Sequence, residues 1–112
     1  MDINVKKSDQ ISIVSIAGSM DALTADRITN CIDERIHSGE NHMVIDLSEV
    51  EFMSSAGLRI ILGALKQIRK QGGNLCIAGA QAGVERVLNM SGLPKILKIY
   101  DDIDNAITQF IV

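Results

Sequence analysis

The hydrophobic pattern of residues 43–65 changes its period part-way, and this change constrains the fold more than any other feature of the sequence. The stretch opens with the apolar run Met43-Val44-Ile45, whose length and composition are typical of a strand buried on both faces. We expect a brief loop at 49–53. Apolar side chains then recur at three- and four-residue spacing, which predicts one face of an α-helix. That face consists of Leu58, Ile61, Leu62, Leu65 and Ile68.

Two serines, Ser54 and Ser55, lie where this predicted helix begins. Serine is a favoured N-cap because its hydroxyl accepts a hydrogen bond from an unpaired backbone N–H. A helix start also tolerates an anion, so a phosphate here would add about −1.5 to −2 charges without unfolding the domain. Ala56 and Gly57 have little or no side chain, which would let a partner approach the backbone closely. Two interpretations follow: a phosphorylation-gated docking site, or a serine that only caps the helix.

The rest of the chain predicts the element order ββαβαβαβα. An early hairpin followed by alternating strands and helices favours a mixed sheet covered by helices, in one α/β domain over residues 1–112. Asp21 and Thr24 are candidate N-caps of the first helix. The expected elements besides the central pair are strands at 3–5, 11–17, 75–78 and 96–100, a hairpin turn at 6–10, and helices at 25–36, 81–90 and 103–111.

Charge and composition exclude several classes of partner. The net charge is −3, so no overall positive field steers the chain to nucleic-acid phosphates, and three aromatic residues make a poor platform for stacked bases. The clustered Lys66, Arg69 and Lys70 are interpreted as a solvated helix face. The longest stretch without a charged residue, 71–84, is too short to span a bilayer, and the N-terminus carries no signal segment. We therefore expect a cytoplasmic protein that binds neither nucleic acid nor membrane.

The sequence indicates no metal ion and no cofactor. Cys31 and Cys76 lie far apart in apolar settings, which is typical of buried reduced thiols. His37 and His42 are expected on an exposed loop, and no further ligand completes a recognised metal-site spacing around them. The phosphate-binding motifs GxGxxG and GxxxxGK[ST] are also missing.

Five motifs occur in order between residues 18 and 93, within a match that runs from about residue 3 to residue 110. They are Gly18-Ser19-Met20-Asp21 with Thr24-Ala25, Asp46-Leu47-Ser48, Val50-Glu51-Phe52-Met53-Ser54-Ser55-Ala56-Gly57-Leu58, Gly72-Gly73, and Met90-Ser91-Gly92-Leu93. This pattern resembles the STAS domain family, and most closely its bacterial anti-sigma-factor antagonists. The resemblance implies a small mixed sheet of about five strands, with four helices packed mainly on one side.

The resemblance also implies a function as an interaction module without enzymatic activity. In the antagonist family, the unmodified domain binds an anti-sigma factor, which is also a serine kinase of the histidine-kinase-like ATPase type, and so releases the sigma factor. The kinase phosphorylates the helix-start serine, which breaks the complex, and a serine phosphatase restores it. Family members are largely monomeric when free.

The motif alignment assigns candidate residues to these roles. It places the phosphorylated serine at Ser55, with Ser54 as a second candidate. Asp21 is expected near this serine, where it would shape the loop and contact the partner, or only cap a helix. The residues implied to bind the partner are Asp21, Thr24, Ser54, Ser55, Ala56, Gly57 and Arg59.

Two positions depart from the best-studied family pattern. Ser54 stands where that type has aspartate, so the carboxylate next to the phosphoserine is lost. Arg59 stands where it usually has glycine, which adds a cation that could pair with a phosphate or with an acidic partner. Both changes alter what a kinase would meet at this site, and neither removes Ser55.

Two alternatives to the switch stay open at this point. In the first, Ser55 is only a cap, and the domain is a constitutive scaffold or a ligand-sensing module in a signalling complex. In the second, Ser55 is an enzymatic nucleophile. We do not expect the second, because the sequence around Ser55 is not GxSxG and the two histidines are predicted on a remote loop.

Overall fold

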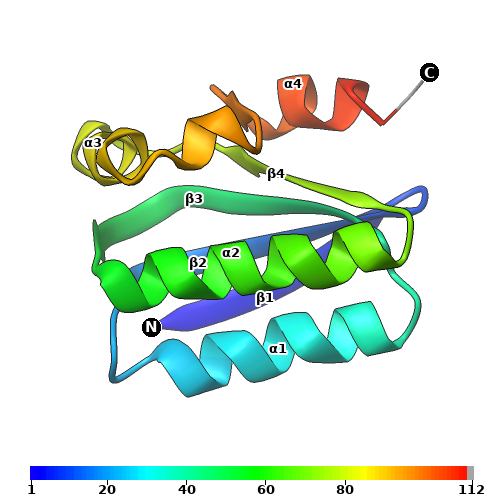
Figure 1. Ribbon diagram of the computed structural model, residues 1–112, viewed down its shortest axis with the longest axis horizontal. Helices are drawn as coiled ribbons and strands as arrows, with labels where there is room; N and C mark the ends of the chain where they lie inside the picture. The colour runs from blue at the N-terminus through cyan, green and yellow to red at the C-terminus, as the bar shows by residue number, and fades with distance from the viewer. Residues whose placement is uncertain (111–112) are drawn as a thin grey trace.

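The computed structural model describes residues 1–110 and contains one five-stranded sheet in the order β1-β2-β3-β4-β5 (Figure 1). The predicted element order is confirmed, with one short 3-10 helix, η1, added after the third α-helix. Ile111, placed in the last helix by the sequence pattern, lies outside the described residues. The elements are β1 (Asp2–Ser8), β2 (Ile11–Met20), α1 (Ala25–His37), β3 (His42–Met53), α2 (Ser55–Lys70), β4 (Asn74–Ala78), α3 (Ala82–Ser91), η1 (Leu93–Lys95), β5 (Ile99–Tyr100) and α4 (Ile103–Thr108).

The sheet is mixed, as predicted. β1 and β2 form an antiparallel hairpin, whereas β2, β3, β4 and β5 are parallel to their neighbours. The hairpin turn is tighter than expected: Lys6 and Lys7 pair with Ile13 and Ser12, which leaves the turn at Asp9 and Gln10. Asp9 has a φ of 55°, a left-handed conformation that aspartate adopts more readily than most residues.

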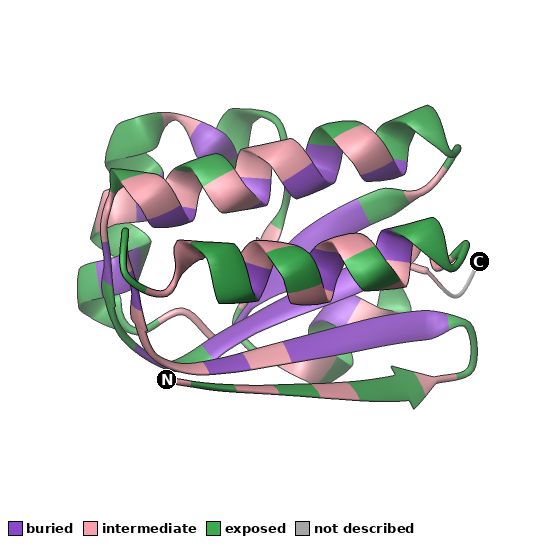
Figure 2. Ribbon diagram, turned by 90° about the horizontal axis from the view of Figure 1, so that it is seen from below, coloured by how far each residue is buried: buried purple, intermediate pink, exposed green. Residues whose placement is uncertain are grey.

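Three α-helices cover one face of the sheet and the fourth covers the other, so the packing mainly on one side is confirmed. On the first face, apolar stripes of α1, α2 and α3 pack on Val14, Ile16, Met43, Ile45 and Leu75. The buried stripes of α1 and α2 alternate with exposed positions in Figure 2. On the second face, α4 and Tyr100 cover a smaller cluster built from Ile11, Ile13, Val44, Cys76, Ala78 and Ala106.

The segment expected to be a loop, 49–53, instead continues β3 to Met53. The expectation was wrong because β2 also runs on, to Met20, and offers its backbone as a hydrogen-bonding partner. The register shifts twice along this extension, so that Val50 and Met53 both become buried on the helix-covered face. β4 pairs with β3 only as far as Asp46, so beyond that residue β3 pairs with β2 alone.

The last strand is shorter than the predicted 96–100 and consists of Ile99 and Tyr100. Gly92 ends α3 with a φ of 82°, and Pro94 lies in η1, which ends at Lys95, directly before the expected strand segment. Because η1 buries Leu93 and the following turn buries Leu97, only two residues remain to pair with β4.

Candidate functional site

The predicted site lies where the ends of β2 and β3 meet the start of α2. The carbonyl of Met20, the last residue of β2, accepts hydrogen bonds from the Ser54 backbone N–H at 2.9 Å and from the Ser54 hydroxyl at 3.3 Å. Met20 is also opposite Met53 in the sheet. The start of α2 is therefore fastened to both strands.

The two serines occupy different structural positions. Ser54 is the N-cap of α2, with extended backbone, and its Oγ accepts from the Ala56 N–H at 3.2 Å. Ser55 is the first residue of the helix and is exposed, and its hydroxyl makes no hydrogen bond within residues 1–110. Ser54 is therefore the N-cap of α2, and the alternative in which Ser55 caps the helix is wrong.

The small residues after the serines serve internal packing more than surface access. Gly57 is buried, and a Cβ there would lie 2.8 Å from Met53 Cγ and 3.0 Å from Met20 Cβ. Its lack of a side chain lets α2 approach the two strands closely. The expectation that Gly57 offers its backbone to a partner is therefore wrong, whereas Ala56 remains half-buried at the surface.

Asp21 and Thr24 shape the loop between β2 and α1. Asp21 Oδ1 accepts from the backbone N–H groups of Leu23, at 2.9 Å, and Thr24, at 3.2 Å. The Thr24 hydroxyl donates to the Ser19 carbonyl at 2.8 Å and accepts from the Asp21 N–H at 3.1 Å. Thr24 precedes α1, but its side chain makes no capping hydrogen bond to that helix. Of the roles considered for Asp21, loop shaping is the one that these contacts support.

Two large apolar side chains near this site were not identified from the sequence pattern. Leu23, on the loop that Asp21 holds, is 95% exposed, and Phe52, close to the end of β3, is 55% exposed. The available signal was that each is a large apolar residue in a segment outside the predicted helices and strands. Surface positions often expose such residues singly, and what distinguishes these two is that Leu23 follows Met20 by three residues and Phe52 precedes Ser54 by two.

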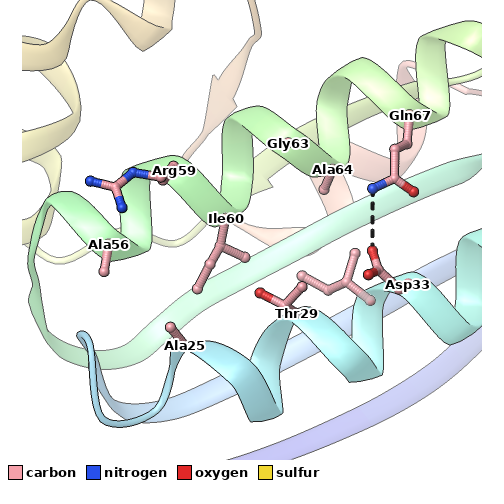
Figure 3. A pocket seen from close by; sticks show the side chains of 10 residues that line it. Ala25, Thr29, Asp33, Ala56, Arg59, Ile60, Gly63, Ala64 and Gln67 are labelled. Carbon is pink, nitrogen blue, oxygen red and sulfur yellow. Dashed lines mark hydrogen bonds between the residues drawn. The ribbon is translucent and has the colours of Figure 1, made fainter.

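A groove of about 220 Å³ runs between α1 and α2 next to the site. Ala25, Ala56, Gly63 and Ala64 are too small to fill it, and at its far end Gln67 donates to Asp33 at 3.3 Å. Figure 3 shows Arg59 reaching back towards the start of α2, above Ala56. Arg59 forms no ion pair within the described chain, and it is four residues from Ser55, one helical turn away.

The cysteines and histidines lie away from this site. Cys76 is buried under α4, and burial raises the pKa of its thiol to about 12. Burial also raises the pKa of the half-buried Cys31, and both thiols are free. His42 is not on an exposed loop as expected: it begins β3, and its ring centroid lies 5.2 Å from that of Phe110, with the rings tilted. His42 and Ser55 thus flank opposite ends of β3, too far apart for a nucleophile and its base.

Within residues 1–110, no group of three or more His, Cys, Asp or Glu side chains is placed to hold a metal ion. In the same part of the chain, no helix combines the length and the apolar character that crossing a membrane requires.

Comparisons with known proteins agree with this geometry. The family model for the STAS domain matches residues 2–106. The chain is 36% identical over 110 residues to an anti-sigma F factor antagonist of Paenibacillus polymyxa, covering 97% of this chain and 94% of that protein. It superposes with a TM-score of 0.89 on an anti-sigma factor antagonist from Mycobacterium paratuberculosis, at 30% identity over 96% of this chain and 92% of that one. The fold is also that of the Bacillus cell fate determinant SpoIIAA in its phosphorylated form, with a TM-score of 0.76, 17% identity, and coverage of 97% and 99%. The chain belongs to the STAS domain family.

Proposed function

We propose that this protein is an anti-sigma-factor antagonist whose binding is switched off by phosphorylation of Ser55. The unmodified chain binds an anti-sigma factor, which is a serine kinase of the histidine-kinase-like ATPase type, and the sigma factor is released. Phosphorylation by that kinase breaks the complex, and a serine phosphatase resets it. The chain itself acts in the cytoplasm as a monomer, without catalysis, metal or cofactor.

The observation that carries this proposal is the difference between the two serine hydroxyls. Ser55 Oγ is exposed at the first position of α2 and is engaged by no described residue. Ser54 Oγ is engaged by the Ala56 N–H and the Met20 carbonyl, so its modification would cost the helix its cap. Ser55 is therefore the favoured acceptor, and Ser54 is the second candidate. The proposal is also supported by two relatives that are named as anti-sigma factor antagonists.

A phosphate on Ser55 has a direct electrostatic consequence for binding. The net charge of the chain would change from −3 to about −4.5 or −5, with the added charge concentrated at one exposed position. A charge that becomes buried in an interface without a partner costs several kcal/mol in effective terms, which is enough to lose a micromolar complex. Arg59 and the α2 N-terminus are available to stabilise the phosphate in the free protein.

The proposed contact surface follows from which predicted residues are accessible. In the first turns of α2, Ser55 and Arg59 are exposed, and Ala56 is half-buried and lines the groove beside α1. Asp21 and Thr24 contribute through the loop that they hold, and Ser54 through the cap. Gly57 is buried and is left out of the contact surface.

The test is phosphorylation and binding with purified anti-sigma factor kinases encoded in the source genome. Ser55→Ala is expected to abolish phosphate incorporation and keep binding, whereas Ser54→Ala keeps incorporation. Ser55→Asp is expected to weaken binding, and its matched control is Ser55→Asn, which adds similar volume without the charge. Phosphate found on Ser54 by fragment mass spectrometry would show that Ser54, and not Ser55, is the phosphorylated residue of the switch. A chain that binds but is never phosphorylated would support the constitutive scaffold instead.

A further inference from the structure

We propose that the groove between α1 and α2 binds a small amphiphilic carboxylate, with the carboxylate on Arg59 and the apolar chain along the groove floor. This site goes beyond the proposed function and does not depend on it, because it concerns a ligand of the chain alone. The ligand is defined by its chemistry: one negative charge on a slender, unbranched apolar body.

The first observation is that the groove is sunk between the two helices. Its volume is about 220 Å³, and all of its described lining residues belong to α1 or α2. Of these residues only Arg59 is exposed, and the others are half-buried or buried. A recess of this kind admits a slender molecule, whereas the broad surface of a folded partner would reach only its rim. The shape therefore favours a small ligand.

The second observation is that the walls are apolar and leave space unfilled. The apolar lining residues are Ala25, Ile32, Ala56, Ile60, Gly63 and Ala64. Most of them are small, and a Cβ built at Gly63 would meet nothing within 4 Å. An apolar cavity of about 150 Å³ is large enough for one benzene ring, so this groove has room for an aliphatic chain of about eight carbons. Covering the walls with such a chain is favoured by the hydrophobic effect.

The third observation is that the charged groups lie at opposite ends of the groove. At one end, Arg59 extends above Ala56 in Figure 3 and forms no ion pair within residues 1–110. Arg59 is the only cation among the described lining residues, so it matches a single carboxylate better than a doubly charged phosphate. At the other end, Asp33 accepts a hydrogen bond from Gln67 and would repel a second anion. The carboxylate is therefore directed to Arg59.

The distance between these ends sets the length of the ligand. Arg59 and Gln67 both line the groove from α2, and the helix rises about 12 Å between them. Octanoate is therefore a suitable probe, because its extended chain covers most of this distance and stops short of the hydrogen bond between Gln67 and Asp33. Ala56, at the Arg59 end, directly follows Ser55, so a bound ligand would lie beside the proposed phosphorylation site.

The experiment titrates the full-length unmodified chain with octanoate and follows the backbone amide signals by nuclear magnetic resonance. Saturable shifts are expected, concentrated in residues 25–33 and 56–67. Acetate carries the charge without the chain, and octan-1-ol carries the chain without the charge. Each of these two probes is expected to bind at least tenfold more weakly than octanoate.

Two variants test the two parts of the site. Arg59→Gln removes the cation and is expected to weaken octanoate binding at least fivefold, whereas Arg86→Gln, at an exposed position of α3, should bind within twofold of the unmodified chain. Gly63→Leu fills the groove and is expected to abolish saturable binding. Its matched control is Gly83→Leu in α3, where a Cβ also meets nothing within 4 Å. Thermal unfolding checks that each variant is folded.

Several outcomes would overturn this site. They are the absence of saturable octanoate binding, unchanged binding in a folded Gly63→Leu variant, or binding of octan-1-ol as tight as that of octanoate. Failure of octanoate to bind, together with loss of anti-sigma-factor binding in Gly63→Leu, would assign the groove to the protein partner instead. All the octanoate measurements use the chain alone, so their failure leaves the proposed function standing. Failure of the chain to bind any anti-sigma factor would likewise leave the octanoate result standing.

Discussion

The two ends of α2 are fastened to the sheet in the same manner but present different groups to solvent. At the N-terminal end, Gly57 packs against Met20 and Met53. At the C-terminal end, Gly73 packs against Asn41, where a Cβ would lie only 1.7 Å from the backbone carbonyl oxygen. In both places the absence of a side chain lets one backbone segment approach another.

At the C-terminal end of α2, several polar side chains donate hydrogen bonds to backbone carbonyls of neighbouring segments. Gln71 Nε2 donates to the Ile36 carbonyl at 3.1 Å, Asn41 Nδ2 donates to the Gln71 carbonyl at 3.4 Å, and Arg69 donates to the Ile96 carbonyl. At the N-terminal end, Ser55 makes no hydrogen bond within the described residues, and Leu23 is 95% exposed, compared with 43% for Ile96 at the other end. The comparison teaches that close packing is common to both ends, whereas the almost fully exposed Leu23 and the free Ser55 hydroxyl occur at the end proposed to bind.

The largest expected effect is at the C-terminal end. Gly73→Ala would place a methyl group against a backbone carbonyl that cannot move aside, so the chain is expected to lose more than about 4 kcal/mol of stability or to fail to fold. Chemical denaturation measures the loss. The matched control is Gly63→Ala, where a Cβ meets nothing within 4 Å and the helix should gain about 0.5–1 kcal/mol. A fully stable Gly73→Ala variant would contradict this description of that end.

A smaller effect is expected for Gly57→Ala at the N-terminal end. The new Cβ would meet Met53 Cγ, which can move, but also Met20 Cβ and the Met20 carbonyl, which cannot. Overpacking of this kind typically costs about 1–3 kcal/mol, partly offset by the better helix propensity of alanine. Because α2 would shift away from the strands, partner binding should also weaken. Loss of stability without any change in binding would show that the packing and the docking surface are independent.

The free energy of unfolding of the chain also depends on pH through Cys76, which lies in β4. Its folded-state pKa of about 12 exceeds the ordinary 9.0, so the unfolded chain releases the thiol proton first. Its contribution is therefore fully present below pH 9 and falls as pH rises towards 12, by about 1.4 kcal/mol per pH unit. Denaturation at several pH values should show this decline in the unmodified chain. The decline should be smaller in Cys76→Ala, and equal slopes in both proteins would contradict the assignment to Cys76.

The smallest effects distinguish the two serines. Ser54→Ala removes the cap and the bond to Met20, at an expected cost of about 1 kcal/mol. Ser55→Ala removes a hydroxyl without a partner and should stay within about 0.5 kcal/mol of the unmodified chain. Parallel denaturation of the two variants checks the difference. Equal losses would mean that Ser55 shares the capping role, which would remove the main reason to prefer it as the phosphate acceptor.

Most of the fold was predictable because its elements carry strong local signals. Helix-spaced isoleucines and leucines identified α1 and α2, and a short apolar run identified the start of β3. The predictions of secondary structure were wrong where contacts with distant segments of the chain decide it. Residues 49–53 became strand because β2 extends alongside them, and the last strand shortened because residues 96–98 form the turn after η1, which buries Leu97. His42 packs on Phe110 from a distant part of the sequence, which no local pattern indicates.

The sequence alone determined the family, the order of the elements and the position of the serine pair at a helix start. These depend on local periodicity, on serine's preference for helix caps and on an ordered set of motifs. Only the tertiary structure decided which serine is the cap, that Gly57 faces inward, and that Leu23 and Phe52 remain uncovered. Each of these facts depends on what the β2 and β3 backbones place beside the start of α2. Burial and hydrogen bonding between segments 30 or more residues apart are properties of the assembled fold, so neighbouring sequence could not supply them.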